Sequence, residues 1–304
     1  MSVYSTKSFE VQNHSVHARL RHIVMDNKSL QDFFNEVGHI DVEKIEYVPF
    51  IRFYLADQLR KKAGEGFQEQ IREILHDRDT GGLTIGVQGQ TNNHDDYIKF
   101  STALTHLIGC PNFDAMSKKF YARFSVKHEF DSDTYLRKAY RTFYLHTDGT
   151  FVNEQTDWVL MMKFEERNAI GGESLLLHLD DWEDLDKFRS NPLASQVYEF
   201  SQKGRASKNV DEVVYSTTFF EKNNSPCIRF NDQCSVPKTI EQAIYHKEIS
   251  ESFERTEKKV AISLPVGDLI LVNNNFWLHG RDAFEENEGL YRELMRQRGC
   301  FAPN

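Results

Sequence analysis

The feature that most constrains the fold of this chain is a change of pattern near Tyr121. Between residues 41 and about 109 apolar side chains recur at helical spacing, whereas after Tyr121 the chain consists of short runs rich in aromatic and β-branched residues. Such runs predict strands, because these side chains pack well on a pleated surface. The pattern indicates an α+β fold in which helices frame a β-rich barrel. The expected strands are residues 83–89, 121–128, 140–146, 157–166, 173–181, 228–230, 259–266, 267–276 and 291–301.

Helices are expected mainly in the first third of the chain. The helical run from Asp41 has a plausible stop at Gly64 and contains Pro49, which permits a kink or a break. Residues 1 to about 28 are polar and aperiodic, which indicates an N-terminal arm. No linker rich in Gly, Ser and Pro divides the chain, so we expect a single domain over residues 1–304. Further helices are expected at residues 66–78 and 94–109, and as insertions among the strands at residues 182–200 and 238–259.

Composition and charge argue against several classes of protein. With 37 Lys and Arg against 46 Asp and Glu, the formal net charge is −9, so charge-driven binding to nucleic acid or anionic lipid is not expected. The longest apolar runs, residues 158–162 and 269–272, are far shorter than the ~20 residues that span a bilayer. The N-terminus has no apolar export segment and the four Cys form no CxxC pair. We therefore expect a cytoplasmic protein without a structural disulfide or a zinc ribbon.

The sequence also contains a candidate metal-binding pattern, His-x-Asp with a distant His. Two neutral imidazoles and one carboxylate can occupy one face of an octahedron around non-haem Fe(II) and leave positions for a cosubstrate and O₂. A strand directs residues i and i+2 to one side, so the pattern suits a sheet. Composition alone predicts roughly two His-x-Asp/Glu matches. The sequence has five: His39/Asp41, His94/Asp96, His146/Asp148, His178/Asp180 and His246/Glu248.

The position of each pair along the chain separates the candidates. Asp41 and Asp96 stand where helices begin, which indicates N-terminal charges or caps, and Asp180 precedes a helical segment, where capping explains it. His246 and Glu248 lie within a charged helical segment, where residues i and i+2 point apart. His146 and Asp148 remain as the best candidate, since they close a predicted strand and precede a Gly-Thr turn.

His279 is the best distant partner for this pair. It follows the predicted strand 267–276 and meets Gly280 and Arg281, which indicates a polar loop at the mouth of the barrel rather than a core position. A loop histidine that bonds to the backbone remains the alternative interpretation.

Three arginines form a second constellation. Arg292, Arg296 and Arg298 lie at even-numbered intervals of four and two residues, so a strand over residues 291–301 would direct all three to one face. Such a face is normally a solvated edge. Because Leu294 shares the same phase, the other interpretation is an inward face that clamps a dicarboxylate through bidentate hydrogen bonds.

Several segments together resemble one enzyme family. They are similar, in sequence and order, to the taurine dioxygenase-like Fe(II)/2-oxoglutarate-dependent oxygenases, and most closely to the CsiD family of glutarate 2-hydroxylases. The resemblance runs from about residue 50 to the C-terminus and implies a double-stranded β-helix, or jelly-roll, barrel. The segments that carry it are residues 106–109, 112–117, 121–124, 146–151, 157–163, 171–182, 276–282 and 292–299.

The resemblance implies roles for five of the candidate residues. His146, Asp148 and His279 would bind Fe(II). Ser174, which follows the expected turn at Gly171 and Gly172, and Arg292 would hold the distal carboxylate of the cosubstrate 2-oxoglutarate.

The resemblance leaves the substrate side more open. Arg296 would contact either 2-oxoglutarate or a dicarboxylate substrate, and Arg298 would contact the substrate. The implied reaction is hydroxylation of glutarate to 2-hydroxyglutarate with release of succinate and CO₂, by a homotetramer. The same machinery acting on another small dicarboxylate or a sulfonate, a non-catalytic carboxylate-binding barrel, and a metal hydrolase are the alternatives, the last disfavoured because a zinc hydrolase would not explain the arginines.

Overall fold

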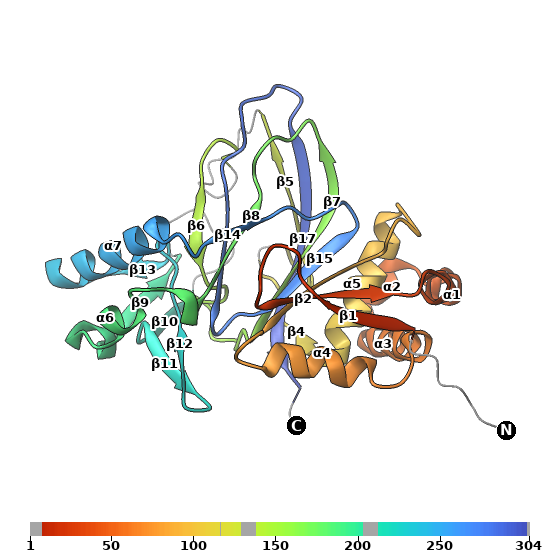
Figure 1. Cartoon of the computed structure of the whole chain (residues 1–304), viewed down its shortest axis with the longest axis horizontal. Helices are drawn as coiled ribbons and strands as arrows, with labels where there is room; N and C mark the ends of the chain where they lie inside the picture. The colour runs from red at the N-terminus through yellow and green to blue at the C-terminus, as the bar shows by residue number, and fades with distance from the viewer. Residues whose placement is uncertain (1–7, 116, 129–137, 203–211, 303–304) are drawn as a thin grey trace.

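The largest element of the computed structural model, which describes residues 8–115, 117–128, 138–202 and 212–302, is an eight-stranded sheet. Its order is β1-β2-β3-β15-β7-β17-β4, and the long strand β17 also pairs with β5 through its first half (Figure 1). All neighbouring strands are antiparallel except β2 and β3. The strands are β1 (Phe9–Asn13), β2 (Leu20–Met25), β3 (Gly82–Gly86), β4 (Gly109–Pro111), β5 (Ala122–Lys127), β7 (Trp158–Arg167), β15 (Asp268–Asn273) and β17 (Tyr291–Phe301).

A second sheet of four strands, in the order β14-β8-β16-β6, packs against the inner face of the large one. One apolar cluster joins the two sheets: it contains Val159 and Met161 of β7 together with Leu176 of β8 and Leu278 of β16. The strands are β6 (Phe143–His146), β8 (Ser174–His178), β14 (Val260–Ile262) and β16 (Trp277–Arg281). The expected β-rich region is therefore present as two facing sheets.

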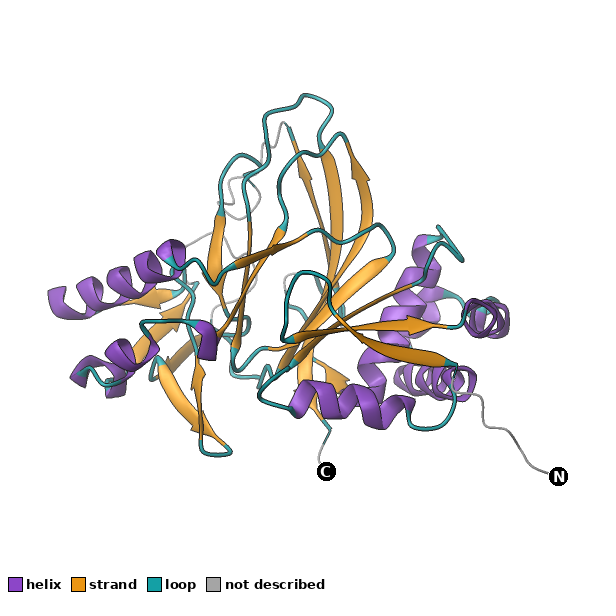
Figure 2. Ribbon diagram, in the orientation of Figure 1, coloured by secondary structure: helices purple, strands orange, loops and turns teal. Residues whose placement is uncertain are grey.

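Helices cover the outer face of the large sheet. Side chains alternate across β7, so that Leu160 and Met162 pack with the helices while Val159 and Met161 face the second sheet. Figure 2 shows these helices gathered on one side of the strands. They are α1 (Asn27–Val37), α2 (Val42–Tyr47), α3 (Pro49–Ala63), α4 (Phe67–His76) and α5 (His94–Ile108). Pro49 divides the predicted helical run into α2 and α3, because proline fits the first helical turn but not a helix interior.

A smaller lobe lies at the other end of the second sheet (Figure 1). Two small sheets, β10-β9-β13 and β11-β12, pack there with two α-helices around an apolar cluster that includes Tyr198, Phe230 and Phe253. The elements are η2 (Leu179–Asp181), α6 (Leu185–Arg189), η3 (Pro192–Ser195), β9 (Tyr198–Ser201), β10 (Val213–Ser216), β11 (Phe219–Lys222), β12 (Ser225–Ile228), β13 (Ser235–Val236) and α7 (Ile240–Arg255). No described helix is both long and apolar enough to cross a membrane.

The N-terminal arm expected for residues 1–28 is wrong where the structure describes it. Strands β1 and β2 form an antiparallel hairpin, and β2 continues the large sheet parallel to β3. In β2, Ile23 and Met25 pack in the cluster under the helices, Leu20 packs in the cluster between the sheets, and Arg21 and His22 are only partly buried. Apolar and polar residues do not alternate strictly along β2, so the segment has no clean period of two, which explains the misreading.

The helical insertion expected over residues 182–200 is also mostly wrong. The α-helix ends at Arg189, and the segment then forms a short 3₁₀ turn and strand β9. Asn191 caps the 3₁₀ turn and Pro192 cannot continue a helix from the preceding residues. The other insertion, residues 238–259, forms the expected helix α7.

Candidate metal centre

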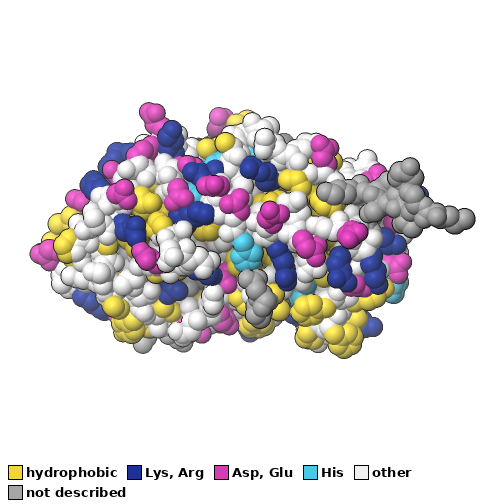
Figure 3. Space-filling view, turned by 60° about the horizontal axis from the view of Figure 1, so that its bottom comes forward, with side chains coloured by type: hydrophobic (Ala, Val, Ile, Leu, Met, Phe, Trp, Pro, Cys, Tyr) yellow, Lys and Arg dark blue, Asp and Glu magenta, His cyan; other side chains and the backbone are white. Residues whose placement is uncertain are grey.

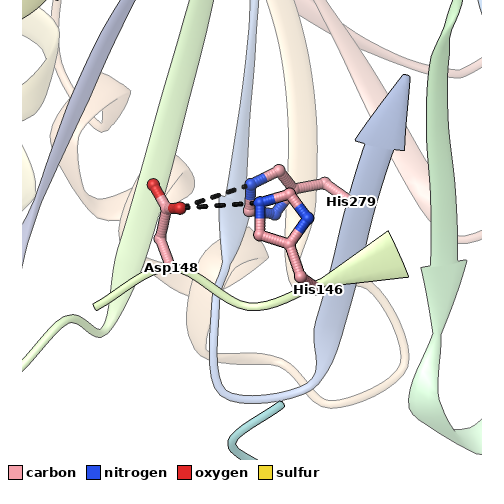
Figure 4. Close-up of side chains that lie close together, drawn as sticks. All are labelled: His146, Asp148 and His279. Atoms are coloured by element: carbon pink, nitrogen blue, oxygen red, sulfur yellow. Dashed lines mark ion pairs between the residues drawn. The ribbon is translucent and has the colours of Figure 1, made fainter. Parts of the chain in front are cut away.

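His146, Asp148 and His279 come together between the two sheets. His146 ends β6, Asp148 follows in the next loop, and His279 lies opposite His146 in β16. One oxygen of Asp148, Oδ1, is 3.7 Å from Nε2 of His146 and 3.8 Å from Nε2 of His279 (Figure 4). One potential ligand atom from each residue lies within 4.8 Å of the others, and this is the one such group of three among the described residues.

The backbone around the triad explains why these side chains converge. His279 lies within a buried strand, so the loop position expected for it is wrong; β16 pairs with both β6 and β8. A side chain at Gly280 would lie 2.5 Å from the carbonyl oxygen of Phe143, so glycine lets β6 approach closely. On the other side, the Asn274 side chain accepts from the Asp148 amide at 2.8 Å and donates to its carbonyl at 3.0 Å. The close approach of β6 to β16 places His146 beside His279, and the bonds to Asn274 hold the backbone of Asp148.

The electrostatics of the triad favour a neutral–neutral–anionic set of ligands. Burial lowers the pKa of His146, and burial with the neighbouring His146 lowers the pKa of His279 to about 3. Burial opposes ionisation of Asp148, but the positive charge of Arg296 holds the pKa of this carboxyl well below its usual range. Nδ1 of His146 lies 2.8 Å from the Tyr144 carbonyl, which leaves Nε2 facing Asp148. This donor set fits non-haem Fe(II).

The three arginines of β17 lie on the inner face of the large sheet. Arg292 and Arg298 are only 3% and 6% exposed, so a solvated edge is excluded. Gln297, which has the opposite phase, bonds instead to Thr105 of helix α5. The sequence phase therefore predicted correctly that the three side chains share a face.

Arg292 lies at the turn formed by Gly171 and Gly172, apart from Arg296 and Arg298. Its Nη1 donates to the carbonyl of Gly172, while its Nε is buried without a hydrogen-bond partner in the described structure. With Lys163 and Glu173 it lines a cavity of about 270 Å³. Ser174 follows Glu173 directly and is buried at the start of β8.

Arg296 lies between two carboxylates. Its Nη1 is 3.2 Å from Oδ2 of Asp148, and its Nη2 donates to Oδ2 of Asp114 at 2.8 Å. Arg298 is buried nearby and interacts with the charges of Arg296, Asp148 and Asp114, while its Nε has no hydrogen-bond partner among the described residues. Sequence reasoning missed Asp114. The signal was its place in segment 112–117, which carried the resemblance without an assigned role.

Two rejected histidines have structural roles. His178 caps the 3₁₀ turn η2 by accepting from the Asp180 amide at 3.1 Å, and its Nε2 lies 2.9 Å from the carbonyl of Arg78. The histidine, rather than the expected Asp180, therefore provides the cap. His246 lies between the hydroxyls of Ser235 and Thr218.

The fold is shared with solved non-haem iron oxygenases. The chain aligns with the non-haem iron oxygenase OrfP, solved in complex with Fe and α-ketoglutaric acid, with a TM-score of 0.64 and 13% identity over 90% of this chain and 91% of that one. It also aligns with an asparagine oxygenase in complex with Fe(II), at a TM-score of 0.63, 14% identity and 90% coverage of each chain. At these identities the likeness concerns the fold.

Sequence similarity shows the family of this chain. The profile of the CsiD family matches residues 9–301, so the chain belongs to that family. Relatives called glutarate 2-hydroxylase include those of Citrobacter koseri, 43% identical over 287 residues, and Pseudomonas putida, 42% identical over 287 residues. Each alignment covers 93% of this chain and 88% of the relative.

Proposed function

We propose that this chain is an Fe(II)/2-oxoglutarate-dependent dioxygenase that hydroxylates glutarate to 2-hydroxyglutarate, with release of succinate and CO₂. The observation that carries the proposal is the convergence of His146, Asp148 and His279 beside buried arginines in a member of the CsiD family. The two facing sheets would act as one double-stranded β-helix barrel within a single domain. A bound Fe(II) would couple the oxidative decarboxylation of 2-oxoglutarate to hydroxylation of the substrate.

The metal would be held by the two Nε2 atoms and Oδ1 of Asp148. Both imidazoles are already neutral because burial lowers their pKa, so no proton has to leave before they bind a cation. Nη1 of Arg296 lies 3.2 Å from Oδ2 and 3.5 Å from Oδ1 of Asp148, and this contact would help to hold the carboxylate beside the histidines.

Arg292 and Ser174 would hold the distal carboxylate of 2-oxoglutarate. The cavity beside Arg292 has room for a carboxylate group, and the buried Nε of this arginine still lacks an acceptor among the described residues. Burial lowers the pKa of the Arg292 guanidinium, yet the group remains a cation at neutral pH. A carboxylate would supply the missing counter-charge.

Arg298 would bind a carboxylate of the substrate. Arg296 already pairs with two carboxylates, whereas the buried Arg298 forms no ion pair among the described residues. Arg296 would complete the end of the substrate site and lie near the metal-binding end of 2-oxoglutarate. A dianion such as glutarate suits this paired positive charge better than a neutral substrate would.

The decisive experiment is anaerobic reconstitution with Fe(II), followed by O₂, 2-oxoglutarate and a panel of dicarboxylates and sulfonates. Stoichiometric succinate and 2-hydroxyglutarate with glutarate is the expected result. Coupling to a different acid would retain the oxygenase class and replace the substrate. Absence of succinate with every acid would favour a non-catalytic carboxylate-binding protein.

We also propose that the protein is a cytoplasmic homotetramer. Hydrophobic side chains are exposed on α2, on α3 and on the loop after β4, including Tyr47, Phe50, Phe53 and Phe113. Figure 3 shows hydrophobic side chains gathered along the lower edge of that view. Exposed patches of this kind are typical of subunit contacts. Light scattering should give four times the mass of the chain.

A further inference from the structure

Asp114 is a buried acid outside the triad, and its loop holds it firmly. The side chain is 5% exposed. Its backbone amide donates to the carbonyl of Lys119 at 2.7 Å, and its carbonyl accepts from the amide of Lys118 at 2.8 Å. Its Oδ1 accepts from the amide of Ser117 at 3.0 Å. With Oδ1 committed to the turn, Oδ2 is the atom that meets Arg296.

Arg296 links Asp114 to the carboxylate of Asp148. One guanidinium nitrogen takes Oδ2 of Asp114 and the other lies 3.2 Å from Oδ2 of Asp148. Only Nη1 therefore reaches Asp148, and it lies close to both carboxylate oxygens, at 3.2 Å from Oδ2 and 3.5 Å from Oδ1. Oδ1 is also the oxygen that faces the two histidines. A guanidinium fork without Asp114 could turn and take both oxygens of Asp148.

We propose that Asp114 is a positioning residue for the metal centre: it holds Nη2 of Arg296, so that the guanidinium reaches Asp148 through Nη1 alone and leaves the carboxylate available to the metal. The proposal rests on the proposed function, since it assumes that the triad binds a divalent cation. Asp114 also balances the charge of Arg296, which would otherwise lower the affinity of the site for a cation. Arg298 lies close to the same pair, so the counter-charge of Asp114 serves a cluster with two cations.

Metal affinity without turnover tests this proposal directly. Co(II) binding to the full chain is measured by calorimetry for the unmodified protein, Asp114→Asn and Asp114→Glu. Loss of an outer-shell partner typically costs about 10- to 100-fold in metal affinity, and we expect a loss of that size for Asp114→Asn. Asp114→Glu keeps the charge and should recover most of it. Asp114→Ser, which keeps an acceptor for the Ser117 amide, replaces Asp114→Asn if that variant does not fold.

The matched control is Glu293→Gln on the same strand as Arg296. Glu293 is also paired with an arginine, Arg123 at 2.8 Å, but on the face of β17 turned away from the triad. Its Co(II) affinity should stay within about twofold of the unmodified chain, since only the ion pair nearest Asp148 acts on the metal. Thermal unfolding of every variant separates lost affinity from lost fold.

A double variant identifies Arg296 as the mediator. If the released guanidinium causes the loss, Asp114→Asn combined with Arg296→Gln should bind Co(II) more tightly than Asp114→Asn alone. Unchanged Co(II) affinity in folded Asp114→Asn, or a double variant at least as weak as the single one, would overturn the proposal. His146→Ala distinguishes the underlying assumption: if that variant also binds Co(II) normally, the triad itself is wrongly assigned.

Discussion

At the scale of single residues, the triad depends on each of its three side chains. His146→Ala, Asp148→Ala or His279→Ala should abolish Fe(II) binding and turnover while the chain remains folded, because two remaining ligands cannot hold the metal on one face. Anaerobic iron titration with circular dichroism measures both quantities. His178→Gln is the control, since His178 caps a turn instead of facing the triad. Loss of iron in the control together with normal iron in His146→Ala would reverse our choice of ligands.

Arg292 and Ser174 should differ strongly in their effect on 2-oxoglutarate. Arg292→Ala leaves a buried carboxylate without its cation, which costs on the order of 2 to 5 kcal/mol, or roughly 30- to 4,000-fold in affinity. Ser174→Ala removes one hydrogen bond, worth about 0.5 to 1.5 kcal/mol or somewhat more to a charged acceptor. Titration of the absorbance of the anaerobic Fe(II) complex measures both. Equal and negligible effects would refute both assignments.

At the scale of elements, α7 carries a histidine that makes stability depend on pH. Burial lowers the pKa of His246 to about 4, and its ring stacks on Tyr198 at 4.0 Å. Because the unfolded chain takes up this proton near its ordinary pKa of about 6.5, stability falls as the pH drops from there toward 4. The contribution lost between pH 7.5 and pH 5 is about 2 kcal/mol.

Chemical denaturation of the unmodified chain and His246→Gln at both pH values isolates this contribution. The variant should be less stable at neutral pH, because it disturbs the bonds to Ser235 and Thr218, yet it should lose less stability on acidification. An identical pH dependence for both proteins would show that His246 does not titrate on unfolding.

At the scale of the whole molecule, the arrangement of the two sheets should make the enzyme select its substrate by chain length. With one carboxylate held by Arg298 and the metal held across from it, a five-carbon chain would bring C2 to the reacting position. Succinate would be too short and adipate would overfill the site, so we expect glutarate to be hydroxylated fastest.

Mass spectrometry of the hydroxylated acids, with succinate counted in parallel, measures this preference. Arg298→Ala should uncouple 2-oxoglutarate consumption from hydroxylation, because the substrate loses its anchor while the cosubstrate site remains. Equal rates across chain lengths would contradict the predicted selection by chain length and leave the reaction class unchanged.

The local pattern of the sequence determined much of the fold and part of the site. Strand periodicity is a property of neighbouring residues, so it predicted β7, β15 and β17 and the shared face of the three arginines. Helical periodicity likewise predicted α5. The position of each His-x-Asp/Glu pair along the chain selected His146 and Asp148 from the five candidates, although composition alone would produce roughly two such pairs.

Tertiary structure alone decided how distant segments meet. The hairpin β1-β2 joins the sheet through pairing with β3, and the apolar residues of β2 do not alternate with a detectable period. His279 became a strand residue because β6 and β8 flank it on both sides. The pairing of Arg296 with Asp114 joins residues 182 positions apart. Ion pairs of this kind depend on the register and packing of the sheets, which a local sequence pattern does not contain.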